Sequence, residues 1–149
     1  MKGISIIEII IILAIISILL GIVIINLTSF REEQALNVAI NESISYINDA
    51  RSKTLSSKDF SQYGIHFEQT KITLFKGTSY SPSDQNNIDY IFSSLLEISN
   101  ISLNGGGNEV IFQKITGKTD QFGPIIYRVK NNPSKLKTIT IKSTGIIDY

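Results

Sequence analysis

The hydrophobic pattern of this chain changes character along its length, and each change predicts a different kind of structure. From Ile9 to Phe30 there are twenty-two residues without one formal charge. The segment Ile6–Ile25 alone gives about 30 Å of helix, which is the thickness of the hydrocarbon layer of a membrane. We therefore predict a membrane helix over residues 4–30.

Beyond this run, the apolar residues recur at helical spacing while charged side chains occupy the other face. The apolar stripe consists of Leu36, Ile40, Ile44 and Ile47, with Ala35, Ala39 and Ala50 beside them. Such a stripe predicts a helix that packs one face against a globular domain. Neither Gly nor Pro occurs between Ile22 and Tyr63, so we expect a single helix from about residue 4 to about residue 56. Residues 31–56 are its amphipathic half, and a polar cluster at Ser56–Asp59 ends it.

Residues 57–149 carry the signals of a small, mainly antiparallel β-domain, in which short β-prone runs alternate with turn-forming segments. The predicted strands are Tyr63–Glu68, Lys71–Lys76, Glu109–Ile115, Pro124–Lys130, Lys137–Lys142 and Gly145–Asp148. The stretch from Ile88 to Leu103 fits either a strand or a short helix, and Asn131–Ser134 is a predicted turn. The expected fold class is α+β, with the long N-terminal helix packed on the β-domain.

Length, cysteine content and charge limit the kinds of domain and site that the chain can form. The 149 residues suffice for an anchor and one domain, and without cysteine the chain forms neither a disulfide nor a thiolate metal site. The formal charge of +1 hides an asymmetry between two parts of the chain. Residues 31–109 carry six Lys/Arg against ten Asp/Glu, whereas residues 110–149 carry seven against two. The basic part fits either lysine-rich solvent faces or a patch for phosphates or acidic partners.

Glu8 is the one charge at the head of the apolar run, and an ionised carboxylate at membrane depth costs about 2.5 kcal/mol or more. Neither a cleaved secretory signal nor a plain signal anchor explains it. The run Lys2-Gly3-Ile4-Ser5-Ile6-Ile7-Glu8, followed by the charge-free segment, resembles the class III signal of type IV prepilins and type II secretion pseudopilins. The resemblance implies that a prepilin peptidase removes a leader of residues 1–3 by cutting after Gly3, and that the new N-terminus at Ile4 is N-methylated.

By the same resemblance, Glu8 is the fifth mature residue, where this family places its glutamate. The free amine at Ile4 then lies one turn from Glu8. In a stack of subunits, the Glu8 carboxylate of one copy can pair with the Ile4 amine of a neighbour, which neutralises both charges and fixes the axial register. The chain departs from the family in having Ile rather than Phe at position 4 and no Pro in the apolar helix. The absence of proline favours a minor subunit over an abundant fibre subunit.

The β-domain layout is similar to that of the GspH/FimT-type minor pseudopilins, which have a late Val-x-Phe-like strand, a glycine turn and a closing pair of strands. The matching residues are Val110-Ile111-Phe112, Gly117, Ile125-Ile126-Tyr127, Thr138-Ile139-Thr140-Ile141 and Gly145-Ile146-Ile147.

The resemblance therefore implies a minor pilin or pseudopilin, a non-enzymatic structural subunit of a type IV pilus or type II secretion filament. Its expected partners are other pilins or pseudopilins, the prepilin peptidase and inner-membrane lipid. It would cross the bacterial inner membrane once, with the N-terminus cytoplasmic and the globular domain outside, before the helix over residues 4–30 enters a filament core. The resemblance leaves open whether the machine is a pilus, a secretion pseudopilus or a competence filament.

A DNA-binding minor pilin for DNA uptake is the alternative. In that case the basic C-terminal residues would track phosphates with salt-dependent affinity. These residues are Lys114, Lys118, Arg128, Lys130, Lys135, Lys137 and Lys142.

Other candidate chemistry is weak. His66 is the single histidine and has no second ligand at metal spacing, which favours a structural role. Gly105–Gly107 follows no strand-to-helix pattern and is a turn, not a phosphate cradle. Asp84 and Asp89 lack the offsets of a calcium loop. We expect no enzymatic activity, no cofactor and no metal.

Overall fold

The computed structural model describes residues 5–149, except that the side chains of residues 20–26 lie outside the description. The chain divides into two compact units, Met1–Gln34 and Ala35–Tyr149. The described elements are α1 (Ile6–Leu55), a 3₁₀ turn η1 (Lys58–Phe60), β1 (Tyr63–Phe67), β2 (Lys71–Lys76), β3 (Ile88–Ile91), β4 (Leu96–Ile101), β5 (Glu109–Ile111), β6 (Gly123–Val129), β7 (Asn132–Ile141) and β8 (Ile147–Asp148).

The long helix forms as its sequence predicts. Its first turn closes where the Glu8 N–H donates to the Ser5 carbonyl at 3.0 Å, and it ends at Leu55, before Ser57 takes a left-handed conformation. The predicted membrane segment at residues 4–30 includes positions outside the description. Among the described residues, no helix has both the length and the apolarity that crossing a membrane requires.

The second half of α1 belongs to the core of the unit Ala35–Tyr149. Leu36 and Ile47 are buried, as the apolar stripe predicts, and Ile44 is partly buried. Two small polar residues continue the same buried face. Ser43 accepts a hydrogen bond from the Tyr127 hydroxyl at 2.9 Å, so this burial leaves neither hydroxyl without a partner.

Thr54 makes an equivalent contact with β1, in the other sheet. Its Oγ1 donates to the Ala50 carbonyl at 2.9 Å and accepts from the Tyr63 N–H at 2.8 Å. Tyr63 lies on β1 and Tyr127 on β6, so the helix is hydrogen-bonded to both sheets.

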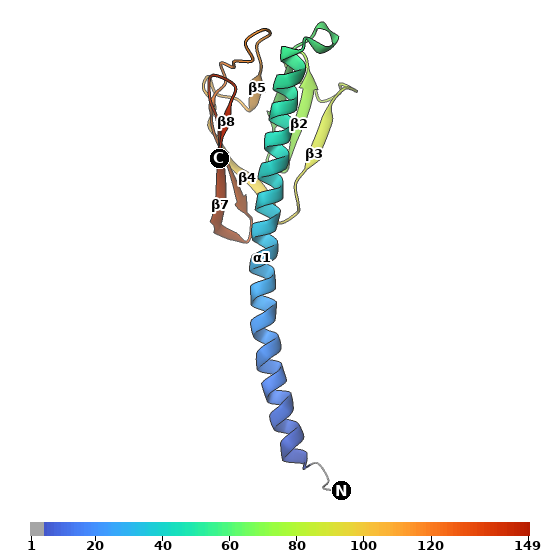
Figure 1. Cartoon of the computed structure of the whole chain (residues 1–149), viewed down its shortest axis with the longest axis vertical. Coiled ribbons are helices and arrows are strands. Elements are labelled where there is room, and N and C mark those ends of the chain that lie inside the picture. Colours follow the sequence, from blue (N-terminus) through green and yellow to red (C-terminus); the bar gives the residue numbers. More distant parts are fainter. Residues whose placement is uncertain (1–4) are drawn as a thin grey trace. The chain divides into compact units, whose positions relative to one another are not determined.

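The strands form two four-stranded sheets with the orders β3-β2-β1-β5 and β4-β6-β7-β8, and every pairing is antiparallel. In Figure 1, β2 and β3 lie on one side of the second half of α1, and β7 and β8 lie on the other. The predicted α+β class is confirmed. The ambiguous stretch from Ile88 to Leu103 forms the two strands β3 and β4 rather than a helix.

The predicted bounds of β1, β6 and β8 differ from the observed ones by one or two residues, and two other predicted boundaries are wrong by more. The strand predicted to reach Ile115 stops at Ile111, because the Gln113 N–H donates to the Lys118 carbonyl at 2.8 Å and turns the chain. The turn predicted at Asn131–Ser134 is shorter, since β7 already begins at Asn132.

Pro133 therefore lies inside a strand. A register shift between β6 and β7 allows the proline at this position. Val129 pairs with Asn132 and Arg128 pairs with Leu136, so residues 133–135 have no partner on β6. Proline lacks an N–H and loses no ladder bond there. On its other side, β7 pairs with β8 only at Thr140 and Ile141. Most of that edge has no strand partner in the described part of the chain.

Gly145 and Gly117 lie in contact in the loops beside the last turns of α1. Gly145 has φ +77°, and a Cβ atom there would lie 2.0 Å from the Gly117 carbonyl oxygen. The same oxygen accepts a hydrogen bond from Arg51 Nε at 3.1 Å. Gly145 was predicted to begin a strand, but it lies in the turn before β8, where its positive φ and the close backbone approach both favour glycine.

Candidate functional site

The N-terminal segment is the first candidate site. The predicted cleavage and methylation positions, Gly3 and Ile4, lie outside the described residues. Glu8 lies in the first turn of α1 and its side chain is exposed. A carboxylate at this end complements the partial positive charge of the helix N-terminus. The position leaves Glu8 available to a cation from another molecule.

The helix around Glu8 presents apolar side chains on all sides. From Ile6 to Leu19, the large hydrophobic side chains are 46–79% exposed. Ser17 donates its hydroxyl to the Leu13 carbonyl at 2.8 Å, so the polar group is satisfied within the helix itself. A helix that is apolar all round is stable only in lipid or among other helices. This surface can therefore serve insertion or helix–helix packing.

The seven basic residues predicted as a DNA-binding set fall into three places. Arg128 and Lys130 alternate with buried Tyr127 and Val129 along β6 and its turn. Lys135 and Lys137 share the opposite, helix-facing side of sheet β4-β6-β7-β8, as do Ile139 and Ile141 of β7. Lys142 follows β7, and Lys114 and Lys118 lie in the loop between β5 and β6.

Most of these cations have partners inside the chain. Arg128 Nε donates to Glu97 Oε1 at 2.6 Å, and this hydrogen bond holds the pKa of the Glu97 carboxyl below its ordinary value. Lys142 lies 3.0 Å from Asp148 Oδ2. The structure thus brings Arg128 and Lys130 together but does not gather all seven residues on one face. DNA binding stays a prediction.

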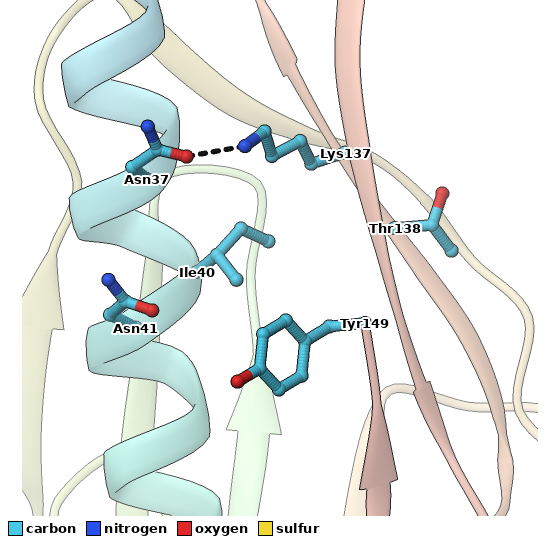
Figure 2. Close-up of a pocket in the computed structure, with 6 residues that line it drawn as sticks. All are labelled: Asn37, Ile40, Asn41, Lys137, Thr138 and Tyr149. Atoms are coloured by element: carbon cyan, nitrogen blue, oxygen red, sulfur yellow. Dashed lines mark hydrogen bonds between the residues drawn. The ribbon is translucent and has the colours of Figure 1, made fainter.

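Lys137 donates to the Asn37 side-chain oxygen across the mouth of a pocket of about 380 Å³. Figure 2 shows Lys137 and Tyr149 reaching from the strand side toward the Asn37, Ile40 and Asn41 side of α1. Ile40 is buried and forms an apolar floor. The lining side chains offer amide and hydroxyl groups and the Lys137 ammonium for hydrogen bonding.

His66 occupies a packed position on β1. Its ring stacks on Tyr80 with a centroid distance of 3.9 Å, and Nδ1 lies 3.4 Å from Glu109 Oε1. Tyr80 also contacts the Phe75 ring edge-on at 5.8 Å. This environment agrees with the structural role predicted from sequence. Among the described residues, no three His, Cys, Asp or Glu side chains gather into a metal-binding group.

Sequence reasoning missed one surface, at the end of α1. Phe60 and Ile115 are 91% and 90% exposed, and both have positive φ angles. Ile115 had been predicted as part of a strand, and no residue pattern near either position signals this exposure.

No protein family, curated protein or solved structure matches this chain.

Proposed function

We propose that this protein is a minor pilin or pseudopilin, a non-enzymatic subunit of a type IV pilus or type II secretion filament. The observation that carries the proposal is the apolar helix with Glu8 in its first turn. Every large hydrophobic side chain from Ile6 to Leu19 is at least 46% exposed, while the core cluster of the described chain begins only at Leu36. Such a surface calls for partners outside the chain.

The position of Glu8 supports assembly through charge pairing. The helix begins at Ile6, and the proposed mature N-terminus at Ile4 precedes Glu8 by four residues in the sequence. Removal of residues 1–3 by a prepilin peptidase would create a free amine beside an exposed carboxylate. Pairing of that amine with Glu8 of a neighbouring subunit removes two uncompensated charges from an apolar setting.

The proposed location follows from the same segment. The helix over residues 4–30 anchors the subunit in the bacterial inner membrane, with the N-terminus cytoplasmic and the globular domain outside. During assembly the helix leaves the lipid for the core of a filament of pilins or pseudopilins. The α+β fold, with the second half of α1 packed on two antiparallel sheets, supports this proposal.

Processing is tested by co-expression of the full chain with a prepilin peptidase and mass spectrometry of the N-terminus. We expect loss of residues 1–3 and a methyl group on Ile4. A Gly3→Glu variant blocks the site and provides the control, since it should retain Met1. An intact N-terminus in the unaltered chain, with an active peptidase present, would count against the proposal.

Assembly is tested with a Glu8→Gln variant, which removes the charge but keeps the shape of the side chain. We expect processing to continue and incorporation into filaments to fall at least tenfold, because a buried amine without its partner costs about 3–5 kcal/mol. Glu42→Gln, at an exposed position in the second half of α1, is the matched control and should assemble normally. Equal assembly of both variants would exclude the pairing.

A DNA-binding minor pilin stays the second candidate, because Lys114, Lys118 and Lys130 are exposed and the last forty residues carry a net positive charge. A gel shift of the full chain in detergent with duplex DNA, at low and moderate salt, tests it. Absence of retardation at low salt removes this candidate.

A further inference from the structure

The backbone is strained in two loops at one end of the helix. Among the described residues, four that are not glycine have positive φ angles, and all four lie in these loops. They are Ser57, Asp59, Phe60 and Ile115, with φ from 52° to 71°. Positive φ is unfavourable for a bulky residue and especially for a β-branched one. The strain therefore marks the two loops as segments held in an unfavourable conformation by their surroundings.

Direct contacts hold the two loops side by side. Lys114 Nζ donates to the Phe60 carbonyl at 2.7 Å, and Gln62 Nε2 donates to the Phe112 carbonyl at 2.8 Å. A Cβ atom on Gly117 would lie 3.1 Å from the Leu55 side chain, so the second loop also rests on the last turn of α1. Figure 1 shows the loop after α1 and the loop after β5 at the same end of the helix.

The strained loops present apolar side chains to solvent. Phe60 is 91% exposed and Ile115 is 90% exposed, with Leu55 beside them at 38%. We call these three residues the apolar tip. An aromatic and a branched aliphatic side chain held almost wholly in water, on strained backbone, stabilise nothing within the chain. Their exposure on adjoining loops leaves an apolar surface that a partner can cover.

Positive charge surrounds the apolar tip. Lys58, Lys114 and Lys118 are exposed in the same two loops. Asp59 is the nearest carboxylate, and it already accepts a hydrogen bond from Tyr63 and lies 3.5 Å from Lys76. The other carboxylate of the loops, Asp120, accepts from Gln113 at 3.0 Å. The three lysines of the loops thus exceed their two aspartates, and the tip is complementary to an anionic surface.

We propose that the apolar tip inserts into the surface of an anionic lipid bilayer, with Lys58, Lys114 and Lys118 at the level of the headgroups. The size of the tip favours lipid over protein. A stable protein interface buries roughly 800 Å² per partner, and the three side chains of the apolar tip supply less than that area. A fluid bilayer accepts such side chains without a complementary shape, and lysines near anionic headgroups add attraction. The inference does not depend on filament assembly.

The chain contains no tryptophan, so one introduced residue reports on its own surroundings. The Phe60→Trp variant of the full chain, carried in neutral phosphatidylcholine nanodiscs, is mixed with phosphatidylglycerol vesicles that contain brominated lipid. We expect a blue shift of its fluorescence and strong quenching. Ile91→Trp is the control, because Ile91 is also well exposed, at 70%, but lies away from the apolar tip. It pairs with Lys71 at one end of β2, whereas Lys76, at the other end of β2, pairs with Tyr63 near the tip. The control should show neither change.

Two substitutions separate lipid contact from folding. Asparagine tolerates positive φ, so Phe60→Asn and Ile115→Asn keep the loop conformation and remove the apolar surface. We expect each to lower vesicle partitioning at least about tenfold, since burial of a Phe or Ile side chain is worth more than one factor of ten. Their melting temperatures should be unchanged or higher. Lys118→Gln should weaken binding about fivefold, and added salt should reduce that difference.

Three results would overturn the proposal. In the first, neutral and anionic vesicles produce the same spectrum. In the second, the Ile91→Trp control responds as strongly as the Phe60→Trp variant. In the third, the asparagine variants partition like the unaltered chain. If Lys118→Gln weakens a gel shift with duplex DNA while the vesicles give no response, the lysines serve nucleic acid and the lipid proposal fails.

Discussion

The two halves of helix α1 share one backbone conformation but differ completely in the surroundings of their side chains. Large apolar side chains from Ile6 to Leu19 are 46–79% exposed, whereas Leu36 and Ile47 are at most 1% exposed. The second half finds its partners in the strands of its own chain, at Tyr63 and Tyr127. Helix formation and helix burial are thus separate properties. Helix formation is set by the local sequence, whereas helix burial depends on which partners are present to cover the side chains.

The largest expected effect is a difference in unfolding free energy between substitutions in the two halves of α1. Ile47→Ala should lower the free energy of unfolding of the β-domain by about 2–5 kcal/mol, because it opens a cavity in a closed core. Ile11→Ala removes the same atoms from the exposed half and should change that free energy by less than about 0.5 kcal/mol. Urea unfolding of the full chain in mild detergent, followed by near-ultraviolet circular dichroism, measures both. A similar loss in the two variants would contradict the comparison.

A smaller effect tests how the second half is held. Tyr127→Phe leaves the buried Ser43 hydroxyl without its hydrogen-bond partner and should cost about 1–3 kcal/mol. The double variant Tyr127→Phe with Ser43→Ala removes both polar groups and should recover part of that loss. A double-mutant cycle on unfolding free energies measures the coupling. Additive effects would mean that the bond contributes nothing to the attachment of the helix.

The smallest effect is a dependence on pH confined to the β-domain. Hydrogen bonding from Arg128 lowers the pKa of Glu97, and hydrogen bonds from Thr73 and then Lys71 lower that of Asp89. A carboxyl whose pKa is lower in the folded state stabilises the fold above its unfolded pKa, and that contribution disappears as the pH falls through the folded value. The melting temperature of the β-domain should therefore decline below about pH 4.5, the ordinary value for Glu97.

The control for this effect is Glu97→Gln, which should flatten the decline. The far-ultraviolet helical signal at low pH should persist beyond loss of the near-ultraviolet signal, because the first half of α1 does not depend on these carboxyls. Simultaneous loss of both signals would show that the halves unfold as one unit.

The sequence predicted those elements whose signal is local. The helix follows from its period and from the absence of Gly and Pro, and it is observed at Ile6–Leu55. Strand β2 lies at its predicted bounds, Lys71–Lys76, because a run of alternating β-prone residues stands between clear turns. Boundaries failed where a distant partner decides them. Pro133 signals a turn locally, but the register of β6 makes room for it in a strand.

The candidate sites divide in the same way. Glu8 was identified from its spacing, because a charge at the head of an apolar run is visible in one dimension. Phe60 and Ile115 were not, since their exposure depends on two loops meeting across fifty residues of sequence. The distribution of the seven basic residues over three places likewise follows from strand alternation and loop position, which composition does not record.

The partly unpaired edge of β7 has a consequence for crowded subunits. Exposed strand edges recruit one another and lead to amyloid-like growth. Pro133 lacks a backbone N–H, and Lys135 and Lys137 place charges along the strand, so this edge is a poor template for another strand. Molecules that gather at high local concentration are thereby discouraged from joining sheet to sheet.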